Sequence, residues 1–188
     1  MMTAAITSTV RDLYENVYRP IRLRSRSDNT KRLYKFSLDR FDEFLGRPAI
    51  LSDFDDHTVC RFLEWRRSSG VASSTVERDR YNILALWRFA NRKRLVDSWP
   101  DVEPELIPER AALAWSQSDM RKLLDACKLA EGSIGKCPAS IFWQVLHLIL
   151  WDTGERIGAA INVKWVDVDL DQAVIACRAE TRKGKRKD

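Results

Sequence analysis

A proline-containing segment over residues 99–110 divides the sequence and limits what it can fold into. The helical periodicity of the preceding residues lapses there, and Pro100, Pro104 and Pro108 appear among acidic residues. Proline lacks a backbone donor and favours extended chain, so this composition is typical of a stiff linker between domains. We therefore predict three parts: one domain over residues 8–98, a linker over 99–112 and a second domain over 113–188.

Apolar residues in the first part recur at the spacing of α-helices. We expect an opening helix around residues 10–17 that ends at Pro20, and a second helix capped by Asn29 or Thr30 and stopped at Gly46. A third helix is expected after a cap at Asp55 or Asp56, ending near Gly70. These helices indicate a helical domain whose buried faces are apolar and whose other faces are basic.

The clearest local helix signal follows Gly70. Ser74-Thr-Val-Glu77 has the pattern of a capping box, in which a serine and a glutamate each satisfy the other's backbone N–H. Tyr81, Leu84 and Trp87 then recur at helical spacing. We expect this stripe, Tyr81 included, to be buried, with basic side chains around it.

The second part changes its period along the chain. Ser116-Gln-Ser-Asp119 predicts another helix start, and residues 138–151 predict a core helix that is apolar on most sides. After Trp165 apolar residues alternate with aspartates, residues 173–177 indicate a short strand, and Gly184 suggests a hairpin turn. The fold class predicted is mainly α, with helices and a small β-hairpin or sheet in the second part.

Composition supports a folded protein and is compatible with a polyanionic partner. Apolar residues make up 45% of the chain, which argues against intrinsic disorder, and the excess of 32 Lys and Arg over 27 Asp and Glu gives a net charge of +5. A basic excess is compatible with nucleic acid, although many basic proteins bind none. Charge alone leaves both interpretations open.

Several classes of protein are disfavoured by what the sequence lacks. Cys60, Cys127, Cys137 and Cys177 have no metal-ligand spacing, so we expect neither a metal nor another cofactor. The N-terminus does not have the pattern of a signal peptide, and no apolar run is long enough to cross a membrane. We therefore expect a cytoplasmic protein with no membrane partner and no small-molecule cofactor.

Two basic residues are candidates for chemistry on an anion. Arg156, in Thr153-Gly-Glu-Arg156, follows the apolar helix directly, and a guanidinium held beside a core element can clamp a phosphate through two parallel hydrogen bonds. Lys183 lies beside Gly184 in a run of basic residues. The alternative for Arg156 is an ordinary surface arginine beside a turn, and for Lys183 a solvated tail.

The order of these elements resembles the tyrosine recombinase, or phage integrase, family. The resemblance rests mainly on the segment Trp151-Asp-Thr-Gly-Glu-Arg-Ile-Gly-Ala-Ala-Ile-Asn-Val-Lys-Trp-Val-Asp-Val-Asp169. This segment is similar to the family's block around its first catalytic arginine. Ser27 to Tyr34 and Ala72 to Arg78 echo two helices of the family's N-terminal half more loosely. The resemblance covers the chain from about residue 8 onward.

The resemblance implies a fold and a set of catalytic roles. The first part would be a SAM-like, core-binding helical domain, and the second the beginning of an α+β catalytic domain in which Arg156 and Lys183 are catalytic. Family members attack a phosphodiester with a tyrosine hydroxyl; fixed cations such as Arg156 would neutralise the developing charge and Lys183 would protonate the leaving oxygen. The register of the lysine is open by a residue or two.

Two departures from the family pattern argue against catalysis by this chain alone. The family's second catalytic motif and its tyrosine follow the hairpin, and we expect the 188 residues to be a C-terminally truncated form without them. The tyrosines present lie in the helical half, where we expect Tyr34 and Tyr81 to be buried. Ala159 also replaces a usual acidic residue, which predicts a weakened catalytic pocket.

We therefore predict that the chain binds double-stranded DNA, with self-association on DNA as a further possibility that the family suggests. The basic helices and the resemblance together favour eight DNA-binding residues. They are Lys31, Arg32, Lys35, Arg66, Ser74, Thr75, Arg78 and Arg80. Two alternatives stay open: a non-enzymatic DNA-binding regulator that reuses the fold, and a helical module that docks on acidic protein partners.

Overall fold

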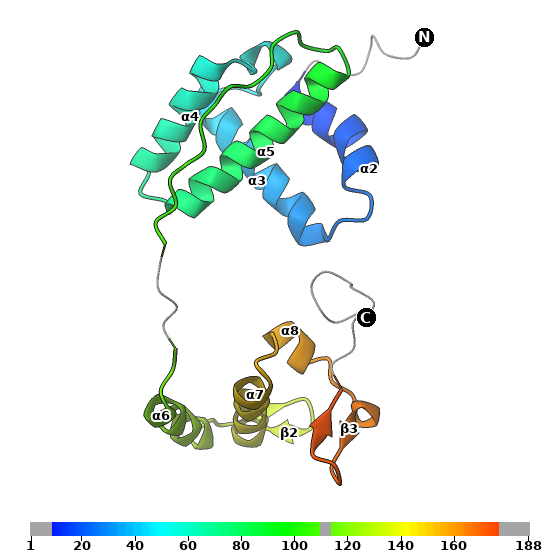
Figure 1. Ribbon diagram of the computed structural model, residues 1–188, viewed down its shortest axis with the longest axis vertical. Helices are drawn as coiled ribbons and strands as arrows, with labels where there is room; N and C mark the ends of the chain where they lie inside the picture. Colours follow the sequence, from blue (N-terminus) through cyan, green and yellow to red (C-terminus); the bar gives the residue numbers. More distant parts are fainter. Residues whose placement is uncertain (1–8, 110–113, 177–188) are drawn as a thin grey trace. The chain divides into compact units, whose positions relative to one another are not determined.

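The computed structural model describes residues 9–109 and 114–176, and the chain forms two compact units, residues 1–110 and 111–188. We call their described parts the N-terminal unit and the C-terminal unit. Both are mainly helical, and the strands are short and confined to the C-terminal unit (Figure 1). Within the described ranges no helix has the length and apolar character needed to cross a bilayer.

The N-terminal unit opens with one helical run of three parts. Its elements are α1 (Val10–Asp12), the π-helix η1 (Leu13–Tyr18) and α2 (Arg19–Arg22). The prediction that Pro20 ends this helix is wrong, because the backbone N–H of Arg19 bonds to the carbonyl of Tyr14 in a wider turn and Pro20 stands at the start of α2. A proline in the first turn loses no hydrogen bond that the helix needs.

The next helices begin and end at local signals. The first, α3 (Asp28–Leu45), is capped by Ser27 rather than by Asn29 or Thr30, and it stops at Gly46, whose φ of 68° is left-handed. A short 3-10 turn, η2 (Leu51–Asp53), leads to α4 (Asp56–Ser68), which is capped by Asp55 as predicted.

The longest helix, α5 (Ser73–Arg92), does not use the predicted capping box. Its N-cap is Ala72, with no side-chain cap. The carboxylate of Glu77 instead accepts from Arg80 and from the backbone N–H of Glu105, both at 2.9 Å. A tertiary partner has therefore replaced the local partnership with Ser74.

The core of the N-terminal unit lies where α5 packs on α3, α4 and η1 (Figure 1). Trp87 is 1% exposed, stacks on Phe54 with ring centroids 5.9 Å apart, and donates from its indole nitrogen to the Ser98 carbonyl at 3.0 Å. Phe41 and Phe62 meet edge to face in the same core. Large apolar side chains with satisfied polar atoms make this a fully packed core.

The proline-containing segment lies against the N-terminal unit over part of its length. Val102 is buried and its carbonyl accepts from Arg80. The Asp101 backbone N–H donates to Asp56 at 2.9 Å, and Glu105 pairs with Arg67 at 2.7 Å. Figure 1 shows this stretch running back along α4 and α5, so at least residues 101–105 belong to the packed N-terminal unit.

The C-terminal unit begins with α6 (Gln117–Lys128), which has the capping box predicted between Ser116 and Asp119. A hairpin that the sequence did not predict follows, formed by β1 (Ser133–Ile134) and β2 (Cys137–Pro138). The apolar helix α7 (Ala139–Thr153) comes next and ends at Gly154, whose φ of 63° is left-handed as a C-cap glycine requires. A single turn, α8 (Ile157–Ala160), completes the helices of this unit's described residues.

The last described elements are shorter than the strands predicted from the alternation of apolar residues and aspartates after Trp165. A 3-10 turn, η3 (Trp165–Asp167), precedes β3 (Val168–Asp169), which pairs antiparallel with β4 (Val174–Ile175). The prediction that α7 is a core helix is wrong for the described residues, because Ile141 is 52% and Val145 48% exposed. The hairpin predicted around Gly184 lies outside the described residues.

Candidate nucleic-acid interface

A groove on the N-terminal unit gathers five arginine side chains. It has a volume of about 620 Å³ and is lined by residues of η1, α2, α3 and α5 and of the loop between α2 and α3. Every charged residue among those that line it is an arginine. We call it the arginine groove; its arginines are Arg22, Arg26, Arg78, Arg88 and Arg92.

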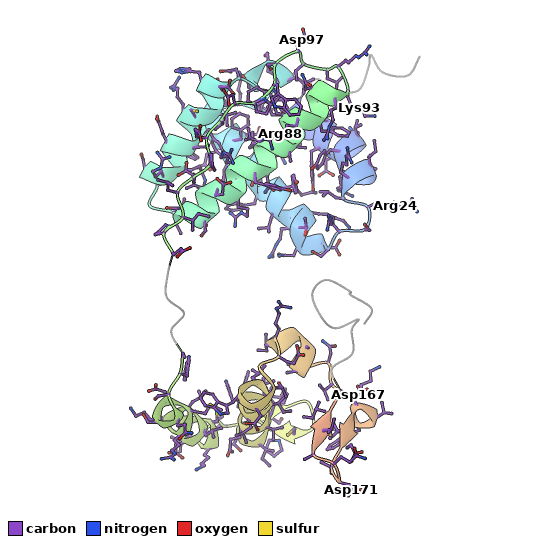
Figure 2. All side chains as sticks on the ribbon, in the orientation of Figure 1. Arg24, Arg88, Lys93, Asp97, Asp167 and Asp171 are labelled. Atoms are coloured by element: carbon purple, nitrogen blue, oxygen red, sulfur yellow. The ribbon has the colours of Figure 1, made fainter. Side chains whose placement is uncertain are left out.

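Helical spacing explains how α5 contributes most of this charge. Arg78, Tyr81, Ala85, Arg88 and Arg92 follow one another at intervals of three or four residues. Residues at these intervals share one face of a helix. Figure 2 shows the side chain of Arg88 on α5.

Four of the five arginines carry charge that no acidic side chain among the described residues neutralises. Within residues 9–109 and 114–176, none of Arg22, Arg26, Arg88 and Arg92 forms an ion pair. Arg22 lies over the ring of Phe89 at 5.9 Å, which orients it without cancelling its charge. Unpaired cations that converge on one groove create a positive potential and attract anions.

The fifth arginine, Arg78, is held by a buried carboxylate. Asp79 is fully buried; its Oδ2 accepts from Arg66 at 2.9 Å, and its Oδ1 accepts from Ser37 at 2.7 Å and from Arg78 at 3.5 Å. The Arg78 guanidinium also lies 5.7 Å from the centre of the Phe36 ring. One carboxylate is thus shared by two guanidinium groups, and Arg78 keeps hydrogen-bonding capacity for a ligand.

Polar and aromatic side chains form the inner wall of the groove. The Asn82 amide donates to Ser37 at 2.9 Å and to the Leu33 carbonyl at 3.3 Å. The hydroxyls of Tyr34 and Tyr18 are 3.0 Å apart. Burial, and then this hydrogen bond, raise the pKa of Tyr34 well above its usual value. Tyr34 therefore contributes an uncharged phenol to the inner wall of the groove.

The predicted cations on α3 are largely occupied by neighbouring groups. Lys31 pairs with Asp28 at 2.8 Å, and Lys35 pairs with Glu15 of η1 at the same distance. Arg32 is exposed and donates to the Asn29 side chain at 2.8 Å. These residues reach solvent at least in part, but the arginine groove is lined by others.

The other predicted residues separate into core and surface positions. Arg66 is 5% exposed, so the structure places it in the core beside Asp79 rather than on a DNA-facing surface. Arg80 is turned toward Glu77 and the Val102 carbonyl. Ser74 is exposed and Thr75 half-buried in the first turn of α5. Arg78 alone of the eight predicted residues lines the groove.

Sequence reasoning missed four groove arginines and one aromatic residue. The signal for Arg88 and Arg92 was present, since both share the helical face of Arg78. The prediction that Tyr81 is buried is wrong: it is 61% exposed, although Leu84 and Trp87 of the same stripe are each 1% exposed. Helical spacing identifies the buried side of α5 but does not show how far along the helix the core extends.

The candidate catalytic residues of the C-terminal unit are only partly described. Arg156 is exposed and is the N-cap residue of α8. Ala159 is 3% exposed, in the same turn. Lys183 lies outside the described residues. Among the described residues no group of His, Cys, Asp or Glu side chains could hold a metal ion.

Comparison with known proteins adds family information to this geometry. Residues 21–94, which span α3 to α5, match the family "Phage integrase, N-terminal SAM-like domain". The chain is 25% identical over 156 residues to the tyrosine recombinase XerA of Thermococcus kodakarensis, a match that covers 83% of this chain and 49% of the relative. It thus spans about half the length of that curated relative. No solved structure matches the chain.

Proposed function

Because this chain is a member of the tyrosine recombinase, or phage integrase, family, we propose that it binds double-stranded DNA in DNA integration and site-specific recombination. The arginine groove carries this proposal. It places five guanidinium groups together, and four of them have no acidic partner within the described residues. The matched SAM-like region includes all five.

The physical basis is recognition of the phosphate backbone. Guanidinium groups match phosphate geometry through paired hydrogen bonds, and their binding releases counterions condensed on DNA. Affinity then falls steeply as salt rises, and each phosphate contact contributes about one to the slope of log affinity against log salt. A groove made of arginines favours affinity without sequence selectivity, because phosphates carry no sequence information.

The test is a salt titration of binding to random-sequence duplex DNA, measured by fluorescence anisotropy. We expect a steep negative slope for the chain, and a slope that is shallower by about two for the Arg88→Ala/Arg92→Ala double variant. Arg61→Ala is the matched control, because Arg61 is an exposed arginine on α4 that does not line the groove. It should leave the slope nearly unchanged.

Three results would contradict the proposal. A weak dependence on salt would exclude phosphate contacts as the source of affinity. An equal loss of affinity in the groove and control variants would mean that general positive charge, rather than the groove, attracts DNA. Binding of acidic proteins in place of DNA would favour the interaction module instead.

We assign this chain a binding role rather than a cleavage role. Its four tyrosines all lie before residue 82; Tyr14, Tyr18 and Tyr34 are buried, and Tyr81 is exposed in the arginine groove of the N-terminal unit. These three buried phenols cannot reach a phosphodiester of bound DNA, and burial also raises the pKa of Tyr14 and of Tyr34 above the usual value. On a nicked suicide substrate we expect no covalent adduct, and trapping one would overturn this assignment.

Arg156 is the residue we assign to phosphate contact in the C-terminal unit, with Lys183 as a proton donor. Support comes from the exposure of Arg156 at the start of α8 and from its place in the Thr-Gly-Glu-Arg segment. Arg156→Ala should lower the salt slope by about one while leaving the N-terminal unit folded. Sedimentation of the same DNA mixtures would test the expectation that the protein self-associates on DNA.

A further inference from the structure

Tyr81 is a large aromatic side chain that the protein leaves uncovered inside the arginine groove. It is 61% exposed and lies on α5 between Arg78, three residues before it, and Arg88, seven residues after it. These positions share one helix face. An open aromatic ring flanked by cations offers a stacking surface for a base and charge for its phosphates, the two features of sites that bind single strands.

The size of the groove separates a duplex from an unpaired nucleotide. Its volume of about 620 Å³ is within the range of sites that enclose small molecules. A base cannot enter this space while it stays stacked in a duplex, because the duplex presents only its backbone and the edges of its bases. A duplex would therefore rest on the rim, whereas a single base that has left the stack could enter and reach Tyr81.

The inner wall of the groove retains hydrogen-bonding capacity. Asn82 lines the groove, and its amide nitrogen donates to Ser37 and to the Leu33 carbonyl. Its amide oxygen is left as an acceptor for a ligand. The Nε atom of Arg78 is buried and has no hydrogen-bond partner within the described residues. An unpaired donor in a folded protein is costly, and here it belongs to a guanidinium that also lines the groove.

We propose that the arginine groove takes one unpaired nucleotide of the bound DNA, whose base stacks on Tyr81 while Arg78 and Arg88 hold the flanking phosphates. This inference rests on the proposed DNA binding and adds a preference to it. Extruding a base costs least where it is already unpaired. The protein should therefore bind DNA that contains a bulged base or a single-stranded segment more tightly than the perfect duplex.

The experiment compares three labelled DNAs of the same sequence: the duplex, the duplex with one bulged base, and the single strand. For Tyr81→Ala in the full chain we expect about tenfold weaker binding of the bulged and single-stranded DNAs and less than about twofold weaker binding of the duplex. Tyr81→Phe keeps the ring and should bind like the unchanged protein. A fluorescent adenine analogue in the bulge should be quenched by the unchanged protein and by Tyr81→Phe, but not by Tyr81→Ala.

Trp99→Ala is the control for loss of an exposed aromatic side chain, since Trp99 is 54% exposed on the same unit and does not line the groove. It should leave all three affinities unchanged. An equal loss on all three DNAs in Tyr81→Ala, or no loss on any, would overturn the stacking site while leaving duplex binding standing. Duplex binding without steep salt dependence would instead overturn the proposed function, so the two failures are distinguishable.

Discussion

The two units of the chain differ in how they bury apolar residues. All the largest fully buried side chains, among them Trp87, Phe41 and Phe62, belong to the N-terminal unit. In the C-terminal unit the buried apolar residues are few and mostly small, such as Ala139 and Ala160, whereas Trp165 is 83% exposed. The N-terminal unit therefore contains its own source of stability, and the described C-terminal unit contains much less.

This difference bears on function as well as on stability. The arginine groove is built on helices fixed by a packed core, so the backbone positions of its arginines are set without a ligand. Arg156 is exposed at the start of α8, a single turn after α7. We infer that the N-terminal unit provides the preorganised part of the proposed DNA contact.

The largest effect should appear in amide hydrogen exchange. Amides in the middle of α5 should exchange slower by several orders of magnitude than those of α7, because opening α5 requires disruption of the main core whereas α7 exposes apolar residues already. Exchange followed by mass spectrometry of peptic peptides measures this directly. Equal protection of α5 and α7 would remove the contrast between the units.

Local signals predicted helix boundaries well where partners are near in sequence. Asp55, Gly46 and the Ser116 capping box all act within a few residues, and the structure has each of them. The capping box at Ser74 failed because Glu77 bonds to the backbone of Glu105 and to Arg80. A long-range contact of this kind cannot be read from helical periodicity.

The same reason limits the prediction of the site. Arginine is usually found on the surface, but Arg66 is buried in the core, where it donates to Asp79, thirteen residues later. Lys35 is paired by Glu15 of another element. Whether a basic residue is free for DNA depends on such tertiary partners, whereas the shared face of Arg78, Arg88 and Arg92 was readable from spacing alone.

The second largest effect concerns the core of the N-terminal unit. Trp87→Ala should lower the free energy of unfolding by about 3–5 kcal/mol, because it leaves a cavity against Phe54 and removes the indole hydrogen bond to Ser98. Urea unfolding followed by circular dichroism measures the change. Leu146→Ala, at one of the few buried positions of α7, is the matched variant in the other unit.

Leu146→Ala should shift the main transition much less than Trp87→Ala does. This expectation follows because the main transition reports on the unit with the packed core. If both variants shift the transition equally, the two units unfold together and the C-terminal unit is more stable than its exposed apolar surface implies.

A third effect tests the charged part of the core. Asp79→Asn should cost about 3 kcal/mol, because Arg66 would keep its charge in a buried position without a carboxylate partner. The double variant Arg66→Met/Asp79→Leu removes both charges and should recover most of the loss. Thermal unfolding of the single and double variants measures this, and a double variant no more stable than Asp79→Asn would contradict the account.

The smallest effect is a pH dependence confined to the N-terminal unit. Burial, with a smaller effect of Glu15, raises the pKa of Tyr14 from 10.0 to about 12. Because the folded state disfavours the phenolate more than the unfolded state does, the stability from neutral Tyr14 is complete below a pH of about 10 and is lost as pH rises toward 12. Urea unfolding of the N-terminal core should therefore show a declining free energy over this window.

Tyr14→Phe is the control for this decline, since it removes the ionisable hydroxyl and its hydrogen bond to the Lys31 carbonyl. The variant should be slightly less stable at neutral pH and should lose stability less steeply between a pH of about 10 and 12, because one of the groups that resist ionisation is gone. Tyr34 keeps its raised pKa, so part of the decline should remain. An identical alkaline decline in both proteins would place the titrating groups outside the tyrosine cluster, and the contrast between the units would then rest on apolar burial alone.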